Sequence, residues 1–210
     1  MPNHITNIIT IKGDEARVRE VLDFVKDGDA LFSLNKIVPM PETFKKYDTT
    51  NHPNGKGLEV GYPVGIEDDG PLVTEELIQE YKLATAEQRV RYGVVGWYDW
   101  RIANWGTKWD AYDISKGDDG TIMFCTAWDA PEPVIKALSA KFPDVEIYHA
   151  WADEDYGYNC GRCTYEGGNA ISVYTPTGGT DYAMEIYFET HPGDEEFIKK
   201  NKDGKWEWCD

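Results

Sequence analysis

The segment from residue 99 to residue 113 holds the side chains of this chain that are best suited to bind another molecule. It carries Trp100, Trp105 and Trp109, and it places one cation, Lys108, between the last two tryptophans. Indole rings can stack on a nucleobase, and a buried indole N–H needs a hydrogen-bond acceptor. The segment therefore predicts either a recognition surface or an aromatic core element, and we expect core packing for Trp105 and Trp109.

A turn of three carboxylates, Asp153, Glu154 and Asp155, follows one of the predicted strands. Carboxylate oxygens suit magnesium or calcium, but the regular acidic positions of a twelve-residue calcium loop are absent. We interpret the turn as a solvated acidic surface. Together with Trp128 and the tryptophan segment it defines the candidate binding residues: Trp105, Lys108, Trp109, Trp128, Asp153, Glu154 and Asp155.

Cys160 and Cys163 have the two-residue spacing of a zinc knuckle. A second close pair is missing, so Cys125, Cys209 or His191 would have to complete the site from separate elements. We expect free thiols, no metal and no cofactor. His149 falls on the apolar side of its strand, which favours a core histidine over a general base. No nucleophile elbow, phosphate-binding loop or zinc-protease motif occurs, and no catalytic residue is predicted.

The charge balance is strongly acidic, with 38 Asp and Glu against 21 Lys and Arg and a formal net charge of −17. Such a charge repels nucleic-acid phosphates and anionic lipids and favours a partner with a basic surface. The alternative is that acidity only keeps the protein soluble. Three acidic clusters fall in predicted turns, Glu67 to Asp69, Asp153 to Asp155 and Asp194 to Glu196.

The N-terminal residues show no basic region followed by an apolar run, and no stretch of 18 apolar residues occurs. We therefore expect a cytoplasmic protein that contacts neither membrane nor nucleic acid.

Hydrophobic periodicity predicts four core strands and two main helices. The strands are expected near residues 3–11, 31–38, 121–128 and 144–151, and the helices over 14–27 and 131–141. Residues 42–70 read as a long excursion, followed by two short helices that begin at Thr74 and Thr85. Further strands are expected near 158–165, 170–174 and 182–190.

These elements predict an α+β protein, a ferredoxin-like antiparallel sheet with helices on one face. A long helical and aromatic insertion and a C-terminal β-meander complete the prediction. We expect a single domain over residues 1–210, with a core formed by 1–40 and 118–152, an insertion over 41–117 and a β extension over 153–210.

Four motifs carry a resemblance to a known family. They are Met1-Pro-Asn-His-Ile-Thr-Asn, Asn104-Trp-Gly-Thr-Lys-Trp-Asp-Ala-Tyr, Thr126-Ala-Trp-Asp-Ala-Pro-Glu-Pro-Val and Ala152-Asp-Glu-Asp-Tyr-Gly. Together they resemble the YubB ferredoxin-like family of tailed phages, prophages and plasmids. The resemblance implies a ferredoxin-like fold and a mobile-element origin, and it implies no catalytic residues.

Two functional hypotheses follow. The first is a non-enzymatic accessory protein of a phage or mobile element that binds a basic surface of a host protein, in a counter-defence or host-modulating role. The second is a small-ligand or nucleotide-binding protein, or an enzyme, with an aromatic pocket around Trp105, Trp109 and Trp128.

Overall fold

The computed structural model describes residues 2–46, 75–117 and 120–209. The chain forms two compact units, residues 1–38 with 105–210 and residues 39–104, which are described separately. Most of the predicted excursion over 42–70, including Glu67 to Asp69, lies outside the described residues. The predicted division into core, insertion and extension stays a prediction.

The first unit contains a six-stranded antiparallel sheet with the order β2-β3-β1-β4-β5-β6. Its strands are β1 (His4–Lys12), β2 (Tyr112–Lys116), β3 (Ile122–Ala127), β4 (Glu146–Asp153), β5 (Gly161–Glu166) and β6 (Asn169–Tyr174). The chain order β1, α1, β2, β3, α6, β4 with β1 between β3 and β4 is the ferredoxin-like arrangement. The predicted fold class is confirmed, and β5 and β6 extend the sheet beyond β4.

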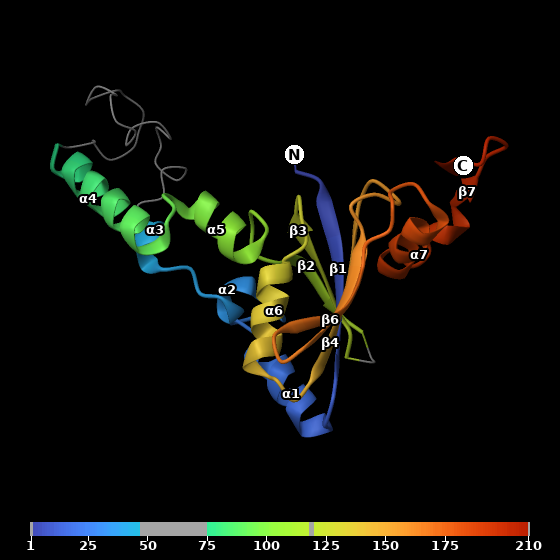
Figure 1. Cartoon of the computed structure of the whole chain (residues 1–210), viewed down its shortest axis with the longest axis horizontal. Coiled ribbons are helices and arrows are strands. Elements are labelled where there is room, and N and C mark those ends of the chain that lie inside the picture. Colours follow the sequence, from blue (N-terminus) through green and yellow to red (C-terminus); the bar gives the residue numbers. More distant parts are fainter. Residues whose placement is uncertain (1, 47–74, 118–119, 210) are drawn as a thin grey trace. The chain divides into compact units, whose positions relative to one another are not determined.

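Helices α1 (Glu15–Phe24), α2 (Leu34–Ile37) and α6 (Glu132–Lys141) cover one face of this sheet, and α7 (Asp181–Thr190) covers the other (Figure 1). Strand alternation separates the two faces. The Tyr148 hydroxyl donates to Glu189 of α7 at 2.6 Å. Phe124 points to the opposite face, where its ring stacks on Phe32 at 4.5 Å.

Two strand predictions are wrong. Residues 31–38 form α2 instead of a strand, because Ser33 caps the helix by accepting from the Lys36 N–H at 3.1 Å. The second core strand is β2, which lies within the predicted insertion. Residues 182–190 form α7, whose N-cap is Thr180 and whose buried positions recur at helical spacing.

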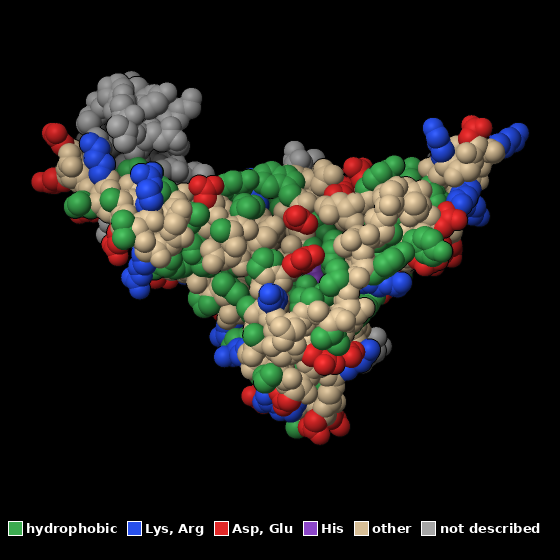
Figure 2. Space-filling view, in the orientation of Figure 1, with side chains coloured by type: hydrophobic (Ala, Val, Ile, Leu, Met, Phe, Trp, Pro, Cys, Tyr) green, Lys and Arg blue, Asp and Glu red, His purple; other side chains and the backbone are tan. Residues whose placement is uncertain are grey.

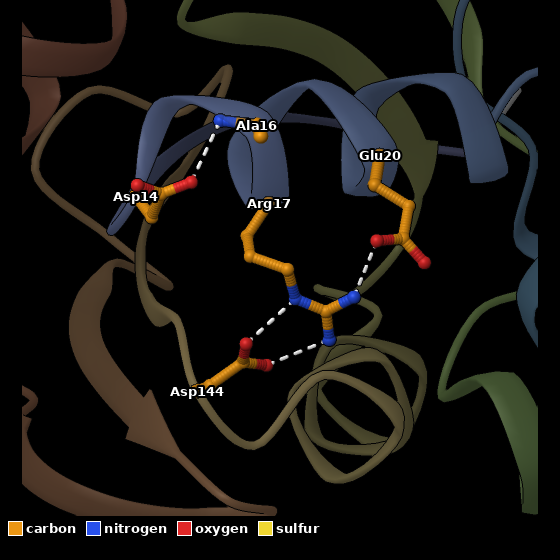
Figure 3. Close-up of polar contacts among 5 residues, drawn as sticks. All are labelled: Asp14, Ala16, Arg17, Glu20 and Asp144. Carbon is orange, nitrogen blue, oxygen red and sulfur yellow. Dashed lines mark hydrogen bonds and ion pairs between the residues drawn. The ribbon is translucent and has the colours of Figure 1, made fainter.

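Arg17 ties α1 to the turn that precedes β4 (Figure 3). Its guanidinium donates from Nε and Nη2 to the Asp144 carboxylate at 2.6 and 2.8 Å, and from Nη1 to Glu20. This ion pair lowers the pKa of the Asp144 carboxyl. At the first turn of α1, the Asp14 carboxylate accepts from the Ala16 N–H at 3.0 Å.

Asn7 is fully buried on the α1 side of the sheet and bonds across both neighbouring strands. Its amide nitrogen donates to the Thr126 hydroxyl at 2.9 Å, and its oxygen lies 3.0 Å from Nε2 of His149. Burial lowers the pKa of His149 to about 3, so this ring is neutral and donates from Nε2. Nδ1 of His149 has no hydrogen-bond partner among the described residues. The predicted core histidine is confirmed.

The second unit contains α3 (Glu42–Lys46), α4 (Glu75–Tyr92) and most of α5 (Trp97–Trp105). Phe44 contacts the rings of Tyr92 and Trp100. The predicted helix start at Thr85 is wrong, because α4 is continuous through it and the buried Gln88 amide instead donates to the Thr43 carbonyl at 3.0 Å.

A short 3-10 helix, η1 (Asp194–Glu196), follows α7 and leads into a hairpin of β7 (Ile198–Lys200) and β8 (Trp206–Trp208). Phe197 and Trp208 stack at 5.5 Å beside this hairpin. Within the described parts of the chain, no helix is long and apolar enough to cross a membrane.

Candidate functional site

Gly106 turns the chain out of α5 and against the start of α6. Its φ of +81° is in the region that favours glycine, and a Cβ there would lie 3.0 Å from the Ala130 carbonyl oxygen. Thr107 follows and is fully buried; its hydroxyl donates to the Ala127 carbonyl at 2.8 Å and accepts from the Ala127 N–H at 3.1 Å. These contacts fasten the tryptophan segment to the end of β3.

Asp110 fixes the other end of the same segment by binding the start of α2. Its carboxylate accepts from the Leu34 N–H at 2.6 Å, the Ser33 hydroxyl at 3.0 Å and its neighbour Ala111 N–H at 2.8 Å. Carboxylates of this kind satisfy the free N–H groups of a helix start. Lys108 and Trp109 are therefore held between two anchored residues.

The tryptophans of the segment divide between core and surface. Trp105 is 1% exposed, and its indole N–H donates to the Val38 carbonyl at 2.8 Å, so the prediction that it is buried is confirmed. Trp109 is half-buried, and its ring meets Tyr112 edge-on at 6.1 Å. Trp105 lies in the core and does not line a surface with the other candidate residues.

Lys108 lies against two indole rings. Its Nζ is 5.1 Å from the ring centre of Trp109 and 4.9 Å from that of Trp128. An ammonium at this distance is attracted by the negative face of each ring. The structure thus brings Lys108, Trp109 and Trp128 together, and the lysine contacts both rings on which a base would stack.

Trp128 immediately follows β3 and is 42% exposed. Its φ of +72° is unusual for a residue with a large side chain. Its N–H donates to the Asn3 carbonyl at 3.0 Å, and its own carbonyl accepts from the Asn159 amide at 3.2 Å. Backbone strain of this kind persists only where surrounding contacts impose it, and it clusters at functional positions.

The acidic turn after β4 is held by the same two asparagines. Asp153 is buried, and its carboxylate accepts from the Asn3 amide at 3.1 Å and from the Asp155 N–H at 3.0 Å. Glu154 and Asp155 are exposed. Asp153 therefore shapes the turn, while Glu154 and Asp155 present their charges to solvent.

We call the group formed by these residues the strand-end surface, and define it as Asn3, Trp128, Asp129, Glu154, Asp155 and Asn159. Partial burial raises the pKa of the Asp129 carboxyl, and the charge of nearby Asp153 raises it further, against a stabilising bond from the Ala130 N–H. Glu132 follows the same pattern, with its pKa raised by partial burial and by Asp129. The negative charges of this region therefore repel one another.

The two cysteines of the zinc-like pair face different sides of the sheet. The Cys160 thiol packs with α7 and lies 3.6 Å from the Ala183 carbonyl, whereas Cys163 pairs with His149 on the α6 side. Burial raises the pKa of both thiols, and all four cysteines are free. Among the described residues, no group of three or more His, Cys, Asp or Glu side chains could hold a metal ion.

Sequence reasoning missed Asn3, Asn159 and Asp129. Asn159 has a φ of +37°, and an Asn beside glycine-rich turns is a signal for this conformation. The acidic residues do not gather on one visible patch. In Figure 2, acidic and basic side chains are mixed over α1 and over the C-terminal hairpin.

The fold defines a ferredoxin-like protein, and a family model agrees with this class. Residues 104–194 match a family model described as the ferredoxin-like domain in Api92-like protein. A solved structure described as protein api92 from Yersinia pseudotuberculosis is similar, with 12% sequence identity and a TM-score of 0.44, over 86% of this chain and 100% of that chain. No curated protein matches the chain.

Proposed function

We propose that the protein is a non-enzymatic accessory factor that binds a basic surface of a host protein through its strand-end surface. The observation that carries the proposal is the half-exposed Trp128, held in a strained backbone conformation beside the exposed carboxylates of Glu154 and Asp155. Aromatic anchors are enriched among the residues that contribute most to binding, and polar and charged groups belong to the rim around them.

The net charge of −17 supports a basic partner. Negative potential accelerates association with a positive surface, and it opposes binding to nucleic acid or anionic lipid. The proposed origin in a phage or plasmid, with a host-modulating role, depends on the resemblance to YubB proteins. A cytoplasmic location belongs to the same proposal.

The geometry gives less support to the small-ligand alternative. Lys108 lies against one face of the Trp109 ring and one face of the Trp128 ring, so a base could stack on those two faces only by displacing it. Trp105, the third residue of the expected pocket, is buried and bonded to the Val38 carbonyl.

The experiment is affinity capture from a bacterial lysate with the full chain as bait, followed by kinetics with the purified partner. The test variant is Glu154→Gln with Asp155→Asn; Asp153 stays unchanged because its carboxylate holds the turn. The control is Glu75→Gln with Glu76→Gln, which removes the same charge from the exposed first turn of α4.

We expect the association rate to fall by about tenfold or more between low and physiological salt. The test variant should slow association more than it speeds dissociation, and the control should change neither by a comparable factor. A partner whose binding ignores both salt and the test variant would contradict the proposal and favour the aromatic pocket.

A further inference from the structure

Trp109 and Trp128 form a cation–π site that the chain fills with its own ammonium group. Nζ of Lys108 lies 5.1 Å from the ring centre of Trp109 and 4.9 Å from that of Trp128. All three residues belong to the first unit. Contact of one cation with more than one aromatic ring is the arrangement by which aromatic cages recognise organic cations. The lysine therefore indicates the kind of group that the two rings accept.

The backbone that carries the two rings is fixed by residues other than the lysine. Thr107, which precedes Lys108, exchanges two hydrogen bonds of 2.8 and 3.1 Å with Ala127, which precedes Trp128. The Trp128 N–H donates to the Asn3 carbonyl at 3.0 Å. These bonds do not involve the ammonium, so they hold the backbone of the site in place when the ammonium moves away.

The Lys108 side chain is able to leave the rings. It is partly exposed, and the Trp128 ring is 42% exposed, so solvent reaches the site. An ammonium is strongly hydrated and sits on a flexible four-carbon stem. At the strength usual for partly exposed cation–π contacts, the two ring contacts favour the closed arrangement, with the ammonium against the rings, by about 5- to 30-fold.

We propose that an arginine guanidinium of the partner replaces the Lys108 ammonium against Trp109 and Trp128. The inference rests on the proposed function, which supplies a partner with a basic surface. A guanidinium stacks on aromatic faces and is more weakly hydrated than an ammonium, so the exchange keeps the cation–π attraction and costs less dehydration. Glu154 and Asp155, on the same strand-end surface, attract its charge. Lys108 is then an internal competitor of the partner.

The first test is NMR titration of the full chain with N-acetylarginine amide at constant ionic strength. The indole N–H of Trp128 and the side-chain protons of Lys108 should shift until the site is saturated, because the probe takes the place of the ammonium. N-acetylcitrulline amide, which has nearly the same shape and no charge, should not bind. N-acetyllysine amide should bind more weakly than the arginine probe.

The second test removes the competitor. Lys108→Ala should raise the affinity for the arginine probe by about 5- to 30-fold, because the rings no longer have to be vacated first. Lys108→Arg keeps a cation on the rings and should not raise the affinity. The control is Lys136→Ala, which removes the same charge from an exposed position of α6 and should leave the affinity nearly unchanged. A lysine that only supports the fold would give no increase in affinity when it is removed.

A Lys108→Ala chain that binds the arginine probe no more tightly than the natural chain would overturn the proposal. Equal binding of the citrulline probe, or tighter binding of the lysine probe, would overturn it as well. The probe is a single amino acid, so these measurements need no partner protein. If the probe binds as expected and no basic host protein is captured, the proposed function fails and the cation site stands. If a basic partner is captured and the probe does not displace Lys108, the proposed function stands and this inference fails.

Discussion

Trp128→Gly should be more stable than Trp128→Ala, which is the reverse of the usual order for these two substitutions. The φ of +72° costs an L-residue roughly 1–2 kcal/mol, and glycine avoids this cost. Glycine also gives the unfolded chain more freedom, which costs roughly 0.4–1 kcal/mol relative to alanine. The difference leaves Trp128→Gly more stable than Trp128→Ala by about 1 kcal/mol.

Both variants lose the indole and its contact with Lys108, at 4.9 Å from the ring centre. Because the ring is 42% exposed, we expect about half of the 3–5 kcal/mol typical of a buried Trp→Ala change. Trp128→Ala should therefore lie about 2 kcal/mol below the natural protein, and Trp128→Gly about 1 kcal/mol below it.

Equilibrium urea unfolding, followed by circular dichroism, measures both differences in the free energy of unfolding. The comparison requires that the natural protein and the two variants have the same slope of this free energy against urea concentration. An alanine variant as stable as the glycine variant would refute the claim of stored backbone strain. Partner binding provides the second measurement. Both variants lack the indole, so both should lose affinity by a similar factor although their stabilities differ.

Three further predictions concern the anchors of the tryptophan segment and the buried histidine of the sheet. Asp110→Ala should lower the free energy of unfolding by about 2–4 kcal/mol, because it leaves the Ser33 and Leu34 donors without their acceptor; Asp110→Asn, which keeps one oxygen, should cost less in the same urea assay. Gly106→Ala should cost about 2 kcal/mol or more by thermal unfolding, because its φ is +81° and its Cβ would meet the Ala130 carbonyl oxygen at 3.0 Å. Burial lowers the pKa of His149 in the folded protein from 6.5 to about 3. Between these two pH values the unfolded state therefore binds one more proton than the folded state. The free energy of unfolding should decrease as the pH is lowered below 6.5, by up to about 1.4 kcal/mol per pH unit. Urea titrations at several pH values should show a shallower slope for His149→Gln.

The sequence predicted the elements whose hydrophobic period is clean. Strand β1 alternates Ile5, Asn7 and Ile9 on one face, and β4, α1 and α6 follow equally regular patterns. Strand β3 is a short run that is apolar on both faces, as expected for a central strand. The first unit could therefore be identified as ferredoxin-like although one of its core strands was assigned to the wrong residues.

The errors have non-local causes. Residues 31–38 are apolar enough for a strand, but Asp110, 77 positions after Ser33, binds the start of α2 and favours a helical turn. Strand β2 has five residues, an irregular register and Asp113 in a left-handed conformation, so it has no clear alternation. Residues 182–190 were predicted as a strand, yet the Thr180 cap of α7 and the spacing of Ala183, Tyr187 and Thr190 carried a helical signal.

The candidate site combines residues that no local pattern connects. Asn3 lies 150 positions before Asp153, and its amide joins the N-terminal strand to the acidic turn. Asn159 donates to the Trp128 carbonyl at 3.2 Å and lies 3.5 Å from the Asp153 carboxylate. The tryptophan segment was the most visible feature of the sequence, but its anchors Thr107 and Asp110 and its buried Trp105 serve the fold. The side chains left for recognition come instead from turns, because turns alone expose both an indole and neighbouring carboxylates while their backbones are fixed by the sheet.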